Sequence, residues 1–384
     1  MIYLFLLVIL FLQSLLLVYP LVKRKFGQRI RMLPKNDVAS VQCAVAQAAN
    51  GMLSSPRVLM SFNDDESLYA MLAKLKSRML GKRAHYSYAY FNFPLSFLLL
   101  GLLDHYIASR DKETLRNVKS KCEDLLDDVG ELKFTFDKID QASFGLVFLQ
   151  LYELTHKDRY LTGAHHIYEG VQNFRGEDGL YRYRLGLDVF FIDTIGLLCP
   201  FLVRYAEVIS NRLIKVDAER QVKFALECCV EPNQGLAFHA FDLTTNQPLG
   251  SINWARGMGW FLLGLSAVAR SGDTYFMSAM QRYTDILMSM REPYGFWPQF
   301  LGHTNDNNID SSGTLMFLYA FQQCGTLKID ATLISAFAGQ CIDSDGRVIK
   351  SSGDTIYINK YSRQKGLSEL SQGLMLSVVS EIKR

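Results

Sequence analysis

The sequence predicts an all-α protein, an (α/α)6 six-hairpin barrel preceded by one N-terminal transmembrane helix. Three observations support this fold class. The first 22 residues are almost entirely apolar, most later segments are long apolar or amphipathic runs between short loops, and glycine-led units recur about every fifty residues. Clear strands with period-two alternation are scarce, which argues against a sheet-based fold.

Residues 1–22 contain only Gln13 and Ser14 as clearly polar side chains. An apolar helix of this length can span the core of a bilayer. No Lys or Arg precedes the run and no small-x-small cleavage site ends it, so a removable signal peptide is the weaker interpretation. We therefore expect a transmembrane anchor here.

A basic juxtamembrane linker at residues 23–38 follows, and its cations are Lys23, Arg24, Lys25, Arg29 and Arg31. Positive charge beside a span marks the cytoplasmic side. We expect a single-pass protein of the inner membrane whose body, residues 39–384, is cytoplasmic. An uncleaved secretory signal with an outward-facing body and a soluble chain are the alternatives.

The predicted barrel domain, residues 39–384, alternates two kinds of helix. Runs such as "PLSFLLLGLLDHYIAS" and "GWFLLGLSAVARS" are apolar nearly all round, whereas "AERQVKFALECCV" and "FMSAMQRYTDILMSM" are amphipathic. A helix that is apolar on every side must be covered on every side. The alternation therefore predicts an inner and an outer layer of helices.

The repeat unit is marked by glycines spaced 49 to 60 residues apart, namely Gly81, Gly130, Gly179, Gly235, Gly295 and Gly346. Several of them lead an aromatic loop, after which a polar cluster opens an apolar helix. Six hairpins closed into a barrel would bring these polar clusters to one end, around one pocket. An open solenoid is the rival fold, but its repeats are shorter, roughly 34 to 47 residues.

Composition excludes several classes of function. The formal net charge is only +3, and its basic excess lies near the N-terminus, so no nucleic-acid partner is expected. The seven cysteines lack C-x-x-C spacing, which indicates neither a disulfide framework nor a zinc site. Phosphate-binding loops, dinucleotide fingerprints, serine-hydrolase elbows and H-E-x-x-H motifs are absent. We expect no metal and no cofactor.

Two acidic residues are candidates for catalysis. Asp193 lies among apolar residues in "FFIDTIGLLCP", where desolvation would raise its pKa and suit it to act as a general acid. Asp140, in "FDKIDQASFG", could supply a second carboxylate for acid and base work on sugars. Each could instead be an ordinary helix N-cap.

The candidate binding residues lie in aromatic segments. His239 in "FHAFD" is either a structural hydrogen-bonding group or part of the site. Arg256, between Trp254 and Trp260, can stack on indole rings and present its guanidinium to a carboxylate, or form an ion pair with a neighbour such as Asp310. Aromatic residues suit the apolar faces of a sugar ring, although core packing is their default role; the candidates are Tyr88, Tyr90, Trp254, Trp260 and Trp297.

Four motifs, in this order, resemble the unsaturated glucuronyl and rhamnogalacturonyl hydrolases of glycoside hydrolase families 88 and 105: "FFIDTIGLLCPFL", "LAFHAFD", "WARGMGW" and "DSSGTLMFLYAF". The earlier stretch "IDQASFGLVFLQLYELTHKDRY" also resembles the family. The resemblance covers roughly residues 80–325. It implies a six-hairpin α/α barrel.

The resemblance also implies a reaction, the hydration of the C4=C5 double bond of a terminal unsaturated uronic acid. Asp193 matches the residue that protonates the double bond and assists water attack at C5, and Asp140 matches a second acidic residue that places substrate and water. The positions matching substrate contacts are His239, Trp254, Arg256, Trp260 and Asn92, and Arg256 or a nearby donor would bind the uronate.

Three positions depart from the family pattern. Phe191 stands where Trp is common, Met258 where Asn is common, and Asp310 where Glu often occurs. These changes are expected to alter the pocket wall, and with it the glycan that is bound.

The expected function is therefore a glycosidase that releases a terminal unsaturated uronic acid, with an unsaturated uronic-acid oligosaccharide as substrate and the membrane as a partner through the N-terminal helix. The alternative is a catalytically altered α/α-barrel glycan-binding protein that serves polysaccharide assembly or export at the membrane. A lyase or epimerase on the same barrel is a third possibility.

Overall fold

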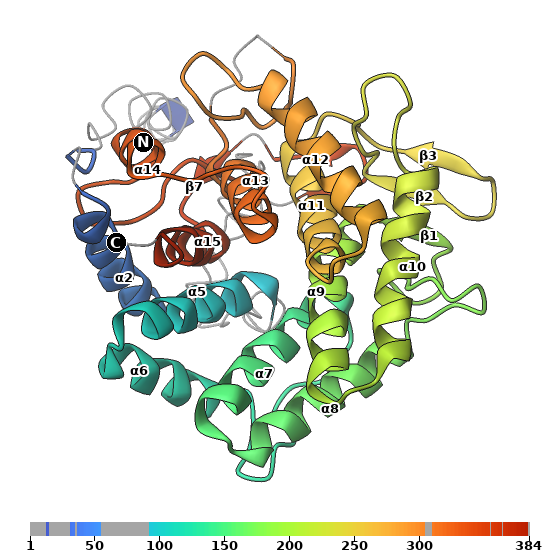
Figure 1. The fold of residues 1–384 in the computed structure, drawn as a ribbon, viewed down its shortest axis with the longest axis horizontal. Helices are drawn as coiled ribbons and strands as arrows, with labels where there is room; N and C mark the ends of the chain where they lie inside the picture. The colour runs from blue at the N-terminus through green and yellow to red at the C-terminus, as the bar shows by residue number, and fades with distance from the viewer. Residues whose placement is uncertain are drawn as a thin grey trace, which may run out of the picture.

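The computed structural model describes residues 13–14, 31–34, 37–54, 92–303, 309–353, 355–362 and 364–382. Their helices form two concentric layers, and Figure 1 shows the inner helices surrounded by the outer ones. Inner helices are apolar nearly all round and outer helices are amphipathic, as the two kinds of sequence pattern require.

In the described part of the chain, six helices form the inner ring, each packed against the next. They are α5 (Phe93–Ser109), α7 (Ser143–Thr155), α9 (Ile192–Val208), α11 (Ala255–Ala269), α13 (Ser311–Cys324) and α15 (Glu369–Ser380). The ring closes where α15 packs against α5. Each inner helix follows one of the repeat positions read from the sequence, so all six begin at the same end of the barrel.

The outer layer consists of α6 (Lys112–Cys122), α8 (Asp158–Gln172), α10 (Arg212–Cys228), α12 (Thr274–Ser289), α14 (Ala331–Cys341) and α2 (Val38–Leu53). Helix α2 packs against α15, so the two ends of the described chain together make the last hairpin. Arg31 and Leu33 also bond to the turn after α14, through Ser344 and Ile342. The predicted domain boundaries at residues 22/23 and 38/39 stay predictions.

Short strands and one 3₁₀ turn occupy the loops that precede inner helices. Before α7 lies η1 (Ile139–Gln141). Strands β1 (Val189–Phe191), β2 (Ala240–Asp242) and β3 (Gln247–Leu249) form an antiparallel sheet in which Phe191 faces Ala240. Before α15, β4 (Ser351–Ser352) pairs with β7 (Lys365–Gly366), and β5 (Thr355–Tyr357) pairs with β6 (Lys360–Tyr361).

Tight turns join the outer helices to the loops that lead inward. Gly130 and Gly179 have φ values of 100° and 77°, a left-handed conformation that a side chain makes costly. Antiparallel bridges close these turns, between Leu126 and Leu132 and between Arg175 and Tyr181. The repeat glycines from Gly130 to Gly346 are therefore all in left-handed turns, while Gly81 lies outside the described residues.

The prediction of a membrane-spanning helix is wrong for the fold that the structure shows. No helix among the described residues is long and apolar enough to cross a membrane. The longest of them have 17 residues, whereas a span needs about 20 apolar residues. The predicted anchor at residues 1–22 lies outside the described residues except for Gln13 and Ser14, which are exposed. The predicted single-pass inner-membrane localisation and the membrane partner thus have no spanning helix to support them in the part of the chain that the structure describes.

Candidate active site

A cavity of about 210 Å³ lies at the end of the barrel where the inner helices begin. Seven of the predicted site residues line it: Asn92, Asp140, Asp193, His239, Trp254, Arg256 and Trp260. Of the other candidates, Tyr88 and Tyr90 lie outside the described residues, and Trp297 does not line the cavity. Residues that are separated by up to 168 positions along the sequence thus meet, because each lies at or just before the start of an inner helix.

Asp193 lies in the first turn of α9, and the helix N-cap is Phe191. Its role as a simple N-cap is therefore ruled out. The Oδ2 atom of Asp193 lies 3.2 Å from Nε2 of His239, and the His239 side chain is almost fully buried. A carboxyl group and an imidazole in direct contact inside a cavity can exchange a proton.

His239 is held from its other side by the segment that precedes α15. Its Nδ1 lies 3.0 Å from the carbonyl oxygen of Ile358 and 3.2 Å from the hydroxyl of Tyr361. The Tyr361 hydroxyl donates to the same carbonyl and accepts from the backbone N–H of Ser251. Burial raises the pKa of Tyr361 to about 12, so this hydroxyl stays protonated near neutral pH.

Asp140 lies in η1 and is buried. It is not the N-cap of α7, which is Ala142. The hydroxyl of Tyr183 donates a 2.5 Å hydrogen bond to its Oδ1. The Tyr183 ring also packs against Phe191, with 5.2 Å between ring centroids. Asp140 is thereby fixed in the cavity wall.

Arg256 is buried, with 1% of its surface exposed, and it lies over the indole of Trp254. Its two terminal nitrogens donate to the backbone carbonyls of Ser352 and Gly353, each at 2.7 Å. Asp310, the N-cap of α13, accepts from the backbone N–H and the hydroxyl of Ser352. Arg256 and Asp310 are therefore joined through Ser352, and the Arg256 side chain holds a C-terminal segment in place.

The aromatic wall has several members. The Trp254 ring lies 4.6 Å from His239 and 5.2 Å from Tyr361 between centroids. Trp260 meets Phe93 edge-on at 5.2 Å. The indole nitrogen of Trp254 is buried and has no hydrogen-bond partner among the described residues, so it is a donor ready for a ligand hydroxyl.

The three residues that depart from the family pattern, Phe191, Met258 and Asp310, differ in whether they line the cavity. Phe191 lines the cavity, but Met258 and Asp310 do not. Met258 is fully buried, and its sulfur accepts from the backbone N–H of Ala237. Of the three changes, only the one at Phe191 alters the cavity wall.

Sequence reasoning missed the cavity residues Tyr183, Arg184, Leu187, Thr355 and Ile358, together with Tyr361 behind His239. Tyr183 and Arg184 follow a glycine turn, in "GLYRYRLG", and this recurring glycine-aromatic loop was the available signal. No local pattern marks the residues from 355 to 361.

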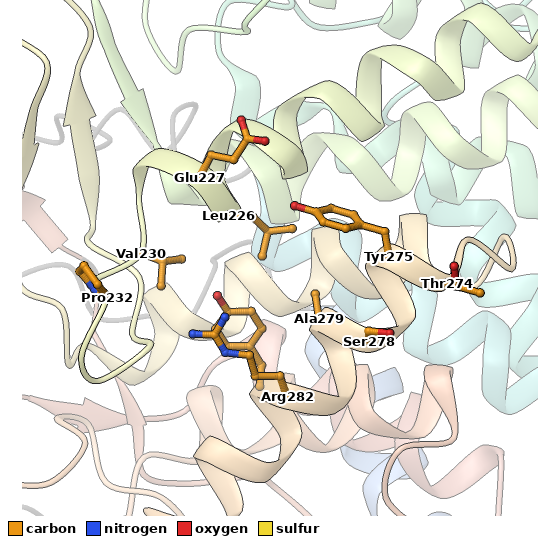
Figure 2. A pocket seen from close by; sticks show the side chains of 10 residues that line it. Leu226, Glu227, Val230, Pro232, Thr274, Tyr275, Ser278, Ala279 and Arg282 are labelled. Atoms are coloured by element: carbon orange, nitrogen blue, oxygen red, sulfur yellow. The ribbon is translucent and has the colours of Figure 1, made fainter.

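A larger hollow of about 710 Å³ lies on the outside of the barrel between α10 and α12 (Figure 2). Figure 2 shows Glu227 on α10 and both Tyr275 and Arg282 on α12, with Arg282 apart from the other two in this view. It contains none of the predicted site residues and no pair of carboxyl groups. We place the chemistry in the smaller cavity because the acidic, imidazole and aromatic groups converge there. Within the described residues, no group of three His, Cys, Asp or Glu side chains could hold a metal ion.

Comparison with known families decides what kind of protein this is. Residues 74–336, more than half of the chain, match Glycosyl Hydrolase Family 88. The chain belongs to this family. Membership of glycosyl hydrolase family 88 confirms the predicted family and the predicted glycosidase class.

The chain shares little sequence identity with the relatives described here. It is 22% identical over 316 residues to the unsaturated rhamnogalacturonyl hydrolase YesR of Bacillus subtilis (strain 168), covering 76% of this chain and 89% of that protein. A possible family 105 member from Salmonella enterica serovar Paratyphi A has a TM-score of 0.73 at 14% identity, covering 90% of this chain and 94% of the other.

The unsaturated glucuronyl hydrolase of Bacillus sp. GL1 has a TM-score of 0.66 at 12% identity, with 90% and 96% of the two chains covered. At such low identities the two solved structures establish a shared fold.

Proposed function

We propose that the cavity hydrates the C4=C5 double bond of a terminal unsaturated uronic acid, with Asp193 as the proton donor. Asp193 gives its proton to C4, a water molecule adds its hydroxyl group to C5, and the proton that this water releases returns to the Asp193 carboxylate. The resulting hemiketal opens, which breaks the link to the rest of the oligosaccharide. The contact between Asp193 and His239 is the observation that carries this proposal.

The hydrogen bonds of His239 limit where protons can lie. The carbonyl oxygen of Ile358 can only accept, so Nδ1 of His239 carries a proton directed toward it. Nε2 is then the ring nitrogen that faces the Asp193 carboxyl, 3.2 Å from its Oδ2. A proton that Asp193 gives to the substrate can be replaced through the same contact, as general acid catalysis requires.

Asp140 is proposed to position the attacking water and a sugar hydroxyl. The hydrogen bond from Tyr183 satisfies one of its oxygens, and its carboxyl lines the same cavity as Asp193. A carboxylate has more acceptor positions than one hydroxyl can fill, so Asp140 can also accept from water.

Asn92, Trp254 and Trp260 are proposed to bind the sugar. Asn92 caps α5 by accepting from the backbone N–H of Phe93, which leaves its amide nitrogen as a donor toward the cavity. The Trp254 indole nitrogen offers a second donor. Indole rings match the apolar faces of pyranose rings.

The test follows the ultraviolet absorbance of the double bond when the full-length protein is incubated with a panel of lyase-generated unsaturated disaccharides. We expect loss of absorbance with at least one member, and none with Asp193→Asn. Asp158→Asn is the matched control, because Asp158 occupies the first turn of the outer helix α8 and is exposed. Stable absorbance with every substrate, or full activity in Asp193→Asn, would overturn the proposal.

A further inference from the structure

A uronic acid brings a negative charge into a cavity that already contains two carboxyl groups, those of Asp140 and Asp193. Burying a third carboxylate there without a cation would be strongly unfavourable, because its desolvation would not be offset. The described lining residues that can carry positive charge are Arg184, Arg256 and His239.

Two of these three groups are already engaged. Both terminal nitrogens of Arg256 bond to backbone carbonyls at 2.7 Å, and turning them toward a ligand would leave two buried carbonyls without donors. His239 is held between Asp193 and the carbonyl of Ile358. Neither is available for a substrate carboxylate without breaking contacts that shape the cavity.

We propose that Arg184 is the cation that binds the carboxylate of the terminal uronic acid, an assignment that rests on the proposed function. Arg184 lines the cavity from the loop before β1 and is exposed at its mouth. In the part of the chain that the structure describes, its guanidinium has no hydrogen-bond or ion-pair partner; it lies 5.9 Å from the ring centroid of Tyr183.

The loop around Arg184 is anchored so that this side chain stays at the cavity. Tyr183 is bonded to Asp140 in the cavity wall, and Leu187 also lines the cavity. The neighbouring Arg182 behaves differently, because it forms ion pairs with Asp178 and Asp188 that hold the loop itself. Arg182 is a structural cation, whereas the guanidinium of Arg184 remains available for a planar carboxylate, which it can bind with two parallel hydrogen bonds.

The experiment compares Arg184→Gln, Arg184→Lys and wild-type protein on two substrates, an unsaturated uronyl disaccharide with a free carboxylate and its methyl ester. Arg212→Gln is the matched control, since Arg212 is an exposed arginine at the start of the outer helix α10. We expect Arg184→Gln to raise KM on the free acid by roughly tenfold to a hundredfold, with a smaller change in kcat. Arg184→Lys should recover part of this loss.

The methyl ester separates charge recognition from a general disturbance of the loop. On the ester, Arg184→Gln and wild type should have similar KM values, because no charge remains to be bound. An unchanged KM on the free acid, or an equal loss on both substrates, would overturn the assignment while leaving the proposed function intact. A wild-type protein that leaves the double bond of every substrate untouched would instead overturn the proposed function, and this inference with it.

Discussion

Replacing Arg256 by Gln tests whether this arginine supports the cavity wall or grips the substrate. In the structure its guanidinium joins α11 to the segment that contains Ser352 and Gly353. That segment continues into Ile358 and Tyr361, which hold His239. We expect Arg256→Gln to destabilise the protein and, through His239, to lower kcat.

The size of the effect follows from the bonds that are lost. Leaving a buried acceptor without a donor costs roughly 1–3 kcal/mol, so losing both carbonyl contacts should cost roughly 2–6 kcal/mol. With an unfolding entropy of about 2.1 cal/mol/K per residue, the 384-residue chain should lose roughly 2–7 °C in Tm. A lysine at position 256 can reach one carbonyl at a time, so Arg256→Lys should lose about half as much.

The assay combines thermal unfolding of the full-length variants with kcat and KM on the same unsaturated disaccharide. A structural role predicts a lower Tm that persists without substrate and a fall in kcat. Arg212→Gln, which removes an exposed arginine, should leave both unchanged. If Arg256→Gln raises KM while Tm stays at the wild-type value, the reasoning is refuted and Arg256 acts on the substrate.

Two other predictions concern the barrel itself. Gly373→Ala should strongly destabilise the protein, because a Cβ at this position would lie 2.0 Å from the carbonyl oxygen of Phe97. Gly51→Ala on α2 places its Cβ in open space, so this variant should be neutral or slightly stabilising. Equal urea unfolding midpoints for the two variants would contradict this prediction. Burial raises the pKa of the Asp104 carboxyl in the folded protein, and the hydrogen bond from Ser377 offsets this rise only in part. The protonated carboxyl therefore stabilises the folded state fully below the pKa of the unfolded chain, about 4, and this stabilisation is lost as the pH rises through the raised pKa of the folded state. Asp104→Asn should therefore flatten the decline in the free energy of unfolding between pH 4 and 8 in urea titrations, and parallel curves for the two proteins would count against this.

The inner helices could be predicted from sequence because their signals are local. Runs that are apolar on every side, such as the one in α11, have no solvent-facing stripe and must lie inside. Glycines such as Gly130 and Gly179 recur because each outer helix ends in a turn that needs a left-handed residue. Once the helices alternate in direction, every inner helix begins at the same end. That geometry is why the sequence alone predicts that Asp193 and Arg256 meet in one pocket, as they do in the structure.

The remaining parts of the site depend on contacts between distant residues, which no local period encodes. His239 meets Ile358 and Tyr361 across more than 100 positions of the sequence, and α2 completes a hairpin with α15 from the other end of the chain. The prediction of a membrane-spanning helix failed for a different reason. Composition at residues 1–22 indicates what a helix of that length could do, but no helix of the described structure has the required length.

Arg256 shows that a motif can suggest one partner while the structure shows others. An arginine between two tryptophans is typical of a carboxylate-binding site, and the residue does line the cavity. Its guanidinium nevertheless reaches two backbone carbonyls that lie 96 and 97 positions further along the chain. The segment that contains these carbonyl groups also donates a backbone hydrogen bond from Ser352 to the Asp310 carboxylate, and further along it Ile358 lines the cavity. Substrate choice should therefore depend on the segment before α15 as well as on the "WARGMGW" motif, because movement of that segment shifts His239 and its contact with Asp193.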